Sequence, residues 1–180
     1  MLKHGKATLS HVVLYCFDFD KMIDFYTSVL GFHLSDKGEA RGSQMCFMTL
    51  NPEADHHMLA LVAGRTGTGE EKVINHISFR VDSLAELRNR HALLTAAGVK
   101  NIEPITHGSW LSVYYRDIEN NRLEFFFDTP WYVRQPTVRP LDLSLSDDEI
   151  MRSTVAEFGE TPEFKMMEDW KAQADKPAVS

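Results

Sequence analysis

The sequence predicts an α+β fold in which a β-α-β-β-β module occurs twice and is followed by a helical extension. Two strand-like segments, LSHVVL at residues 9–14 and INHISF at residues 74–79, each carry one histidine, and each precedes a helical pattern and further strand-like runs. Residues beyond 130 lack this repeat. Because a chain of 180 residues suits one sizeable domain, we expect a domain at residues 1–130, made of modules 9–63 and 74–128, and an extension at 131–180.

The first module opens with a strand at residues 12–17, which leads into a helix at residues 21–30. Apolar residues recur there at intervals of three and four, the pattern of a helix with one buried face: Met22, Phe25, Tyr26, Val29 and Leu30. Gly31 follows the helix. The later runs SQMCFMTL and HHMLALV are predicted strands because of their β-branched and aromatic content.

The second module repeats this order, with a strand at residues 77–81 and a helix at residues 84–97. Ser83 and Glu86 have the spacing of a capping box, and Gly98 can take the left-handed conformation that ends a helix. The buried stripe of this helix comprises Leu84, Leu87, Leu94 and Ala97. WLSVYYRD and RLEFFFD are predicted as the last two strands, since they are rich in β-branched and aromatic residues.

The extension contains two predicted helices. Ser146 and Glu149 form a second capping box, and Thr161 followed by Pro162 is a typical helix start. We expect this region to be a packing or dimer-forming arm, and the final DKPAVS, residues 175–180, to be disordered.

Alternation along the strands places three polar side chains on one face of the sheet. His76 shares a polar strand face with Ser78 and Arg80, while the opposite, apolar face packs beneath the helix. His11 has the equivalent position in the first module, and Glu124 is the only charged residue inside RLEFFF. Two such modules side by side would form a curved sheet, with helices outside and both histidines facing a common cleft.

His11, His76 and Glu124 together form a donor set that suits a divalent metal with open coordination positions, Fe(II) foremost. Each residue also has an ordinary structural interpretation, because a strand histidine is usually a hydrogen-bonded core residue and a strand glutamate usually faces water. The first-module counterpart of Glu124 is Leu59 or Ala60, neither of which binds a metal. A site with three protein ligands leaves positions for a substrate and a small molecule such as dioxygen.

The module pair resembles the vicinal oxygen chelate superfamily and, within it, the small one-domain type I extradiol ring-cleaving dioxygenases. The motifs that carry the resemblance, over about residues 9–128, are LSHVVL, GF after the first helix, HHMLAL, INHISF, THGSWLSVYYRD and NRLEFF. The resemblance implies a curved mixed sheet that forms an incomplete barrel around a metal cleft. It also implies that His11, His76 and Glu124 hold Fe(II), or less commonly Mn(II).

The resemblance also implies roles for three further residues. His57 matches a histidine that acts as acid and base towards the catechol, Tyr114 a tyrosine that donates to the catecholate oxygen, and His107 a loop histidine that contacts substrate. The structural alternatives are an exposed strand end for His57 and a core ring for Tyr114. The separation of His107 from Tyr114 is two residues shorter than in the family. Strict alternation cannot place both His57 and Ala60 in the cleft, so either a bulge intervenes or Ala60 is not the equivalent position.

The activity implied by the resemblance is extradiol cleavage, in which both atoms of O2 enter a catechol-type vicinal diol, such as 2,3-dihydroxybiphenyl, with meta ring opening. Two alternatives remain open. One is a glyoxalase-like metal-dependent isomerase or lyase on the same scaffold, which would consume no oxygen. The other is a non-catalytic protein that binds an aromatic compound and confers resistance.

The turn DIENNR at residues 117–122 departs from the family pattern, which has glycine where this chain has Asn120. Asparagine tolerates the left-handed conformation, so we expect the turn to be retained.

Composition and charge limit the partners. Acidic residues outnumber basic ones 26 to 19, and a net charge of −7 disfavours nucleic acid and anionic membranes. The sequence contains no long apolar run, and MLKHGKATLS lacks the core of a signal peptide, so a cytoplasmic protein is expected. Cys16 and Cys46 should be reduced and buried. A catechol, dioxygen and further copies of the chain are the expected partners.

Overall fold

The computed structural model describes residues 8–68 and 74–174. The chain divides into two compact units. The first contains the residues up to 72 and the turn at residues 117–120, and the second contains residues 73–116 and those from 121 onward. The segment at 175–180, which was predicted to be disordered, lies outside the described residues.

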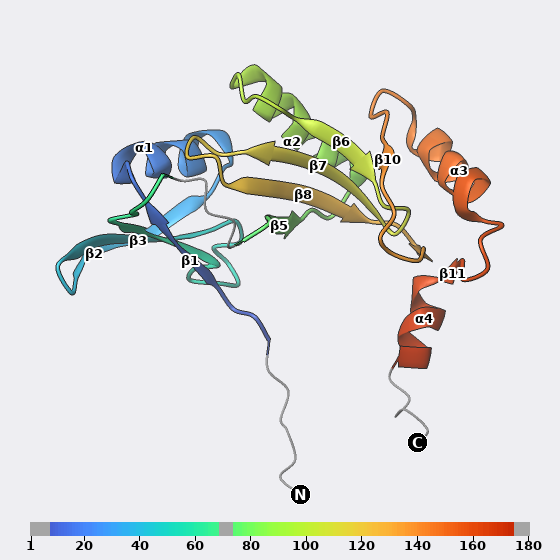
Figure 1. Ribbon diagram of the computed structural model, residues 1–180, viewed down its shortest axis with the longest axis horizontal. Coiled ribbons are helices and arrows are strands. Elements are labelled where there is room, and N and C mark those ends of the chain that lie inside the picture. Colours follow the sequence, from blue (N-terminus) through green and yellow to red (C-terminus); the bar gives the residue numbers. More distant parts are fainter. Residues whose placement is uncertain (1–7, 69–73, 175–180) are drawn as a thin grey trace, which may run out of the picture. The chain divides into compact units, whose positions relative to one another are not determined.

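The first unit is built from the first predicted module (Figure 1). Its strands are β1 (Val12–Cys16), β2 (His33–Ala40), β3 (Ser43–Thr49) and β4 (Leu59–Ala63). They form a sheet in the order β1-β4-β3-β2, in which β1 and β4 are parallel and the other pairs are antiparallel. Helix α1 (Phe19–Asp24) is capped by the preceding residue Asp18, whose side chain accepts a hydrogen bond from the Lys21 backbone N–H.

The predicted helix at 21–30 is present but changes type halfway. Its second half, η1 (Phe25–Val29), is a π-helix, and the Leu30 N–H donates to the Phe25 carbonyl at 3.2 Å. The Thr27 hydroxyl donates to the Ile23 carbonyl at 2.8 Å, which gives that carbonyl a side-chain donor. Met22, Tyr26 and Leu30 are fully buried, so the wider turn retains the buried face that the sequence predicts.

The second unit contains the second module, with β5 (Ile77–Arg80), α2 (Leu84–Ala96), β6 (Glu103–Thr106), β7 (Trp110–Arg116) and β8 (Arg122–Asp128). The sheet order is β10-β6-β7-β8-β5, and β5 pairs with β8 in parallel. Helix α2 packs against β7 and β8 (Figure 1). The predicted α+β fold with two β-α-β-β-β modules is therefore confirmed.

The two ends of α2 follow the sequence signals in part. The Ser83 hydroxyl accepts from the Glu86 backbone N–H, while the Glu86 carboxylate pairs with Arg90 at 2.6 Å. Gly98 has a φ of 72°, as expected of the residue that ends the helix. Leu84, Leu87 and Leu94 are buried, whereas the predicted stripe residue Ala97 is exposed.

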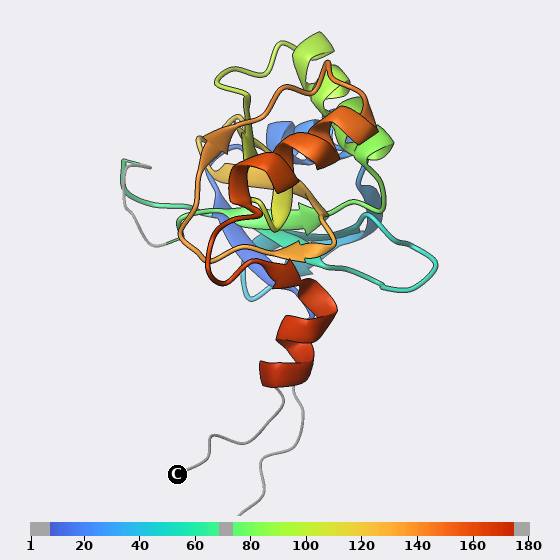
Figure 2. The same cartoon turned by 90° about the vertical axis from the view of Figure 1, so that its right-hand side faces the viewer.

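The extension packs within the second unit. It comprises β9 (Trp131–Tyr132), β10 (Arg139–Pro140), α3 (Asp147–Phe158), β11 (Lys165–Met166) and α4 (Met167–Ala174). Figure 2 shows α3 and the loop before it beside α2, where Arg88 donates to the Leu143 carbonyl at 2.9 Å and pairs with Asp147 at 2.5 Å. The capping box at Ser146 is confirmed. The predicted helix start at Thr161 is wrong, because residues 161–164 form a turn and β11 pairs with β9 before α4 begins.

Burial follows the predicted alternation on the strands that carry the histidines. On β5 Phe79 is buried, whereas its neighbours Ser78 and Arg80 are exposed.

Cys16 and Cys46 are buried and form no disulfide with each other, as predicted, and burial raises the pKa of Cys16 to about 12. Within the described ranges, no helix combines the length and apolar character needed to span a membrane.

Candidate active site

His76 and Glu124 lie side by side in the second unit. The residue pairing of the parallel strands β5 and β8 sets Ser78 opposite Glu124, and His76 directly precedes β5. The His76 Nε2 atom lies 3.4 Å from the Glu124 Oε2 atom. The Glu124 side chain is only 7% exposed, and the Ser78 hydroxyl donates to its Oε2 atom. A nitrogen and a carboxylate oxygen therefore converge at one edge of this sheet.

The other ring nitrogen of His76 is held by Asn75. Nδ1 lies 2.7 Å from the Asn75 Oδ1 atom, and since an amide oxygen only accepts, Nδ1 carries the proton. In the neutral ring, Nε2 then has a free lone pair on the side of Glu124. A second hydrogen bond of this kind commonly fixes the orientation of histidines that bind metals. These two side chains therefore fit the donor chemistry of a divalent metal.

His11 and His57 lie together in the first unit. His11 directly precedes β1, and its ring centroid is 4.6 Å from that of His57. Phe47 on β3 packs edge-on against His57 at 5.0 Å. Burial, followed by the neighbouring His11 and His56, lowers the pKa of His57 and favours its neutral ring. Because His57 precedes β4, which begins at Leu59, the alternation of that strand does not govern its direction.

His56 contacts the Nδ1 atom of His57 and is itself bound by Asp36. The His56 Nε2 atom lies 2.8 Å from the Asp36 carboxylate, and the two Nδ1 atoms of His56 and His57 are 3.0 Å apart. The His56 side chain is 57% exposed. The contact of His56 with His57 depends on Asp36 of β2, which is distant in the chain, so no local pattern in the sequence indicates it.

Tyr114 and His107 form a second polar pair in the second unit. Tyr114 lies opposite Glu124 in the pairing of β7 with β8, and its hydroxyl is 3.1 Å from the His107 Nε2 atom. Burial, and then the Glu124 carboxylate, raise the pKa of Tyr114 well above its usual range. The Arg122 guanidinium lies over the Tyr114 ring, 4.2 Å from its centroid. The phenol is therefore kept protonated beside Glu124.

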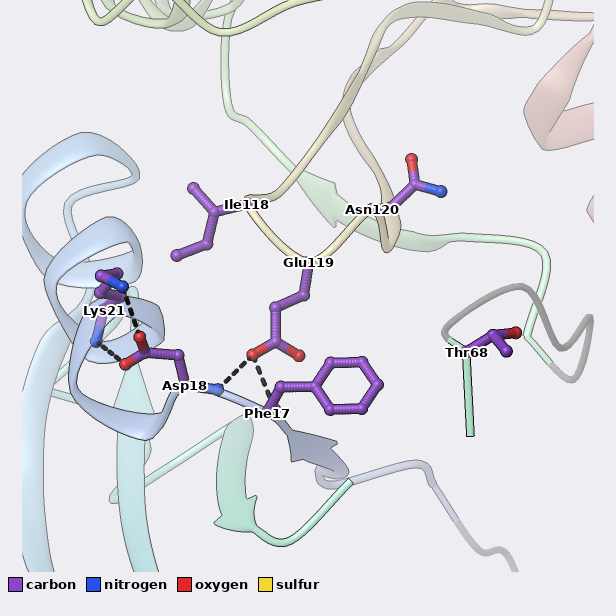
Figure 3. A pocket seen from close by; sticks show the side chains of 7 residues that line it. All are labelled: Phe17, Asp18, Lys21, Thr68, Ile118, Glu119 and Asn120. Carbon is purple, nitrogen blue, oxygen red and sulfur yellow. Dashed lines mark hydrogen bonds and ion pairs between the residues drawn. The ribbon is translucent and has the colours of Figure 1, made fainter. Parts of the chain in front are cut away.

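A pocket in the first unit contains none of the predicted site residues (Figure 3). The Glu119 carboxylate accepts from the backbone N–H groups of Phe17 and Asp18 at 2.7 and 2.8 Å, and Arg65 pairs with it at 3.4 Å. These contacts tie the 117–120 turn to the strand and helix of the first module. The pocket is lined by Phe17, Asp18, Lys21, Thr68, Ile118, Glu119 and Asn120.

The three predicted ligands come from both units, His11 from the first and His76 and Glu124 from the second. Within residues 8–68 and 74–174, no group of three or more His, Cys, Asp or Glu side chains is close enough to hold a metal ion. The complete ligand set therefore stays a prediction, and the second unit supplies two adjacent donors for it.

Two β-α-β-β-β modules with paired donor residues define a module-duplicated protein of the vicinal oxygen chelate type. The model of the Glyoxalase/Bleomycin resistance protein/Dioxygenase superfamily matches residues 8–125, and the chain belongs to this family.

Two known proteins are similar to the chain over about two thirds of its length. Biphenyl-2,3-diol 1,2-dioxygenase 2 of Rhodococcus globerulus is 32% identical over 123 residues, which is 66% of this chain and 62% of that protein. Biphenyl-2,3-diol 1,2-dioxygenase 3 of the same organism is 31% identical over 125 residues, covering 67% and 63%. The chain thus spans less than two thirds of the length of these relatives.

A solved structure supports the fold. The glyoxylase/bleomycin resistance protein/dioxygenase domain from Frankia sp. EAN1pec has a TM-score of 0.60 and 21% sequence identity. The match covers 69% of this chain and all of that domain.

Proposed function

We propose that the protein is a metal-dependent extradiol dioxygenase that inserts both atoms of O2 into a catechol-type vicinal diol and opens the ring in the meta position. His11, His76 and Glu124 would be the protein ligands, Fe(II) the metal and Mn(II) the alternative. The observation that carries the proposal is the pairing of His76 Nε2 with the Glu124 carboxylate at 3.4 Å. The two biphenyl-2,3-diol 1,2-dioxygenases of Rhodococcus globerulus support the choice of substrate class.

The sheet face that carries Glu124 also supports an aromatic substrate. Strand pairing puts Phe126 and Ser112 next to each other on this face, two positions along from Glu124 and Tyr114. Ile105 pairs with Ser112 from the next strand, and both Phe126 and Ile105 are half-buried. A flat aromatic ring would bury apolar surface against these side chains, while its oxygens meet the polar groups.

A bound divalent metal would supply Lewis acidity towards the diol oxygens, and Fe(II) would supply a path by which electrons of the diol reach O2. His57 would accept a diol proton, since its lowered pKa keeps the imidazole neutral near pH 7. Tyr114 would stay protonated and orient the diol through its hydroxyl, because its pKa is raised. Asn75 would hold the His76 ring with Nε2 free.

Oxygen uptake on a panel of catechols tests the activity. The full chain, loaded anaerobically with Fe(II), should consume O2 and form a coloured ring-cleaved product when a diol such as 2,3-dihydroxybiphenyl and air are added. Turnover of a different substrate without oxygen uptake would favour an isomerase or lyase. Tight binding of the diol with neither uptake nor product would indicate a binding protein. Either result would refute the proposal.

The variant His76→Ala tests the ligand assignment. It should lose retained metal because it removes one of three donors, and outer partners such as Asn75 cannot replace it. His33→Ala is the matched control, since His33 is an exposed histidine at the start of β2. Metal content is measured after gel filtration. Full metal occupancy in His76→Ala would refute the assigned site.

A further inference from the structure

We propose that residues 131–137, in the extension, hold the His107 ring with its proton on Nδ1, so that Nε2 accepts the Tyr114 hydroxyl proton. His107 would then act as a positioning residue for Tyr114. The consequence for catalysis rests on the proposed function, whereas the hydrogen-bond arrangement stands on the second unit alone. These residues lie beyond the stretch matched by the family, residues 8–125.

The 131–137 segment is attached to the loop that carries His107. The Val133 backbone N–H donates to the Ser109 hydroxyl at 2.8 Å, and Ser109 is fully buried. The Thr129 hydroxyl donates to the Gly108 carbonyl at 2.7 Å. Gly108 has a φ of 75°, and a Cβ added there would lie 2.5 Å from the Val133 Cγ2 atom. The close approach of the two segments therefore requires glycine at this position.

Gln135 holds the two segments in place with both groups of its side-chain amide, the NH2 group and the oxygen. Its Nε2 group donates to the carbonyls of His107 and Val133 at 2.8 and 3.0 Å. Its Oε1 atom accepts from the Thr137 backbone N–H at 3.1 Å. Gln135 thus sets the position of Thr137 relative to His107.

The Thr137 carbonyl determines which ring nitrogen of His107 carries the proton. It lies 2.6 Å from the His107 Nδ1 atom, and because a carbonyl oxygen only accepts, Nδ1 must donate. A neutral imidazole has one N–H, so Nε2 is bare. The Tyr114 hydroxyl, 3.1 Å from Nε2, is then the donor of that hydrogen bond.

This assignment gives the extension a part in the candidate site. The Tyr114 hydroxyl also lies within hydrogen-bond reach of Glu124, so a bare Nε2 atom on His107 would compete with that carboxylate for the phenol proton. A diol hydroxyl approaching Tyr114 would then meet a phenol oxygen whose lone pairs have a fixed direction. The 131–137 segment would therefore contribute to substrate orientation without touching the substrate.

Nitrogen NMR of the histidine side chains tests the proposal directly, since bare and protonated ring nitrogens differ widely in chemical shift. The full chain, labelled with ¹⁵N and without added metal, is measured at a pH about two units above the ordinary histidine pKa of roughly 6.5. His107→Asn identifies the His107 signals. The expected result is a protonated Nδ1 and a bare Nε2. A proton on Nε2 would overturn the proposal. This holds for the neutral ring with its proton on Nε2 and also for a doubly protonated ring, in which Tyr114 would donate to Glu124 instead.

Gln135→Met is the variant that tests the role of the segment. Methionine keeps the length of the side chain and removes its three hydrogen bonds, so the His107 signals should shift towards a mixture of both tautomers. Thr161→Val is the matched control, because it removes a hydroxyl of the extension that lies outside the 131–137 segment and donates to the Phe158 carbonyl at 2.6 Å. Thermal unfolding verifies that both variants are folded. An unchanged tautomer in folded Gln135→Met would show that Gln135 does not position His107.

Activity separates this proposal from the proposed function. If the wild-type protein cleaves a catechol, Gln135→Met should lower kcat about 10-fold, as expected when an outer hydrogen-bond partner is lost near a metal site, and Thr161→Val should not. An unchanged kcat would confine the segment to a structural role and overturn its catalytic consequence. If the wild-type protein cleaves no catechol, the proposed function fails, while the NMR result still decides the tautomer.

Discussion

At the scale of single residues, the environment of His57 decides which of its nitrogens can act as a base. The Asp36 carboxylate only accepts, so His56 Nε2 carries a proton and its Nδ1 atom is bare when the ring is neutral. That bare nitrogen faces His57 Nδ1 at 3.0 Å, which must then be the donor. His57 is left with a free Nε2 atom, the form required to accept a proton from a diol.

Substitution of His57 tests this role. His57→Gln should lower kcat by about 10²- to 10⁴-fold, the usual contribution of a general acid-base group, while the retained metal is unchanged. His56→Ala should have a smaller effect, on the order of 10-fold, because it removes only an orienting partner. Steady-state kinetics with a catechol and metal analysis measure both. Wild-type turnover in His57→Gln would contradict the assignment.

Asn120 shows how one residue can replace glycine in a turn. Its φ is 68°, and its N–H donates to the Asp117 carbonyl at 3.1 Å, so the left-handed conformation predicted from the sequence is confirmed. Local chemistry of this kind depends on neighbours in the chain and is therefore readable from the sequence.

The turn gives a prediction for stability. Asn120→Val should lower the free energy of unfolding by about 1–2 kcal/mol, because a β-branched side chain is strained at positive φ. Asn120→Gly should cost less, since glycine adopts this conformation freely. Urea denaturation of both variants provides the comparison. Equal losses in the two variants would show that the lost asparagine side chain, and not backbone strain, determines the effect.

At the scale of elements, local signals predicted most helices and strands, and tertiary pairing explains the exceptions. The α2 helix and the capping box of α3 follow the sequence because their determinants lie within four residues of each other. The α4 helix does not begin at Thr161, because Lys165 pairs with Tyr132 on β9 and the Met167 N–H donates to the Pro130 carbonyl. Those partners are distant in the chain, so no local pattern indicates them.

The cap of α3 can be tested by one substitution. Ser146 accepts from the Glu149 N–H at 3.3 Å, and its own N–H donates to the Glu149 carboxylate at 2.9 Å. Ser146→Ala should lower the free energy of unfolding by about 1 kcal/mol and the Tm by about 2–4 °C. Ser153→Ala is the control, since that hydroxyl donates only to the Ile150 carbonyl within the helix. An equal Tm for both variants would contradict the cap.

At the scale of the whole molecule, the module repeat predicted the candidate ligands, whereas side-chain contacts between distant segments could not be predicted. The repeat indicated His11 and His76 at matched positions, and alternation along RLEFFF indicated Glu124. The contact between Gln135 and His107 joins the extension to the second module, and no period in the sequence indicates it. The same is true of Glu119, which ties the 117–120 turn to the first module.

Loss of the Glu119 carboxylate should weaken the fold. Glu119→Ala leaves the N–H groups of Phe17 and Asp18 without this acceptor and removes the ion pair with Arg65, a pair whose side chains are largely buried. The expected loss is about 2–4 kcal/mol of unfolding free energy. Glu39→Ala, at an exposed position on β2, should change it by less than about 0.5 kcal/mol. Denaturant titration compares them, and similar losses would refute a special role for Glu119.

The origin of the oxygen atoms in the product tests the central claim most directly. The Fe(II)-loaded chain is given 2,3-dihydroxybiphenyl under ¹⁸O₂, and the product is analysed by mass spectrometry. We expect a ring-opened product that carries both labelled atoms, apart from any exchanged with water. An intact ring, or a product that contains no label when exchange has been controlled for, would contradict ring cleavage by this protein.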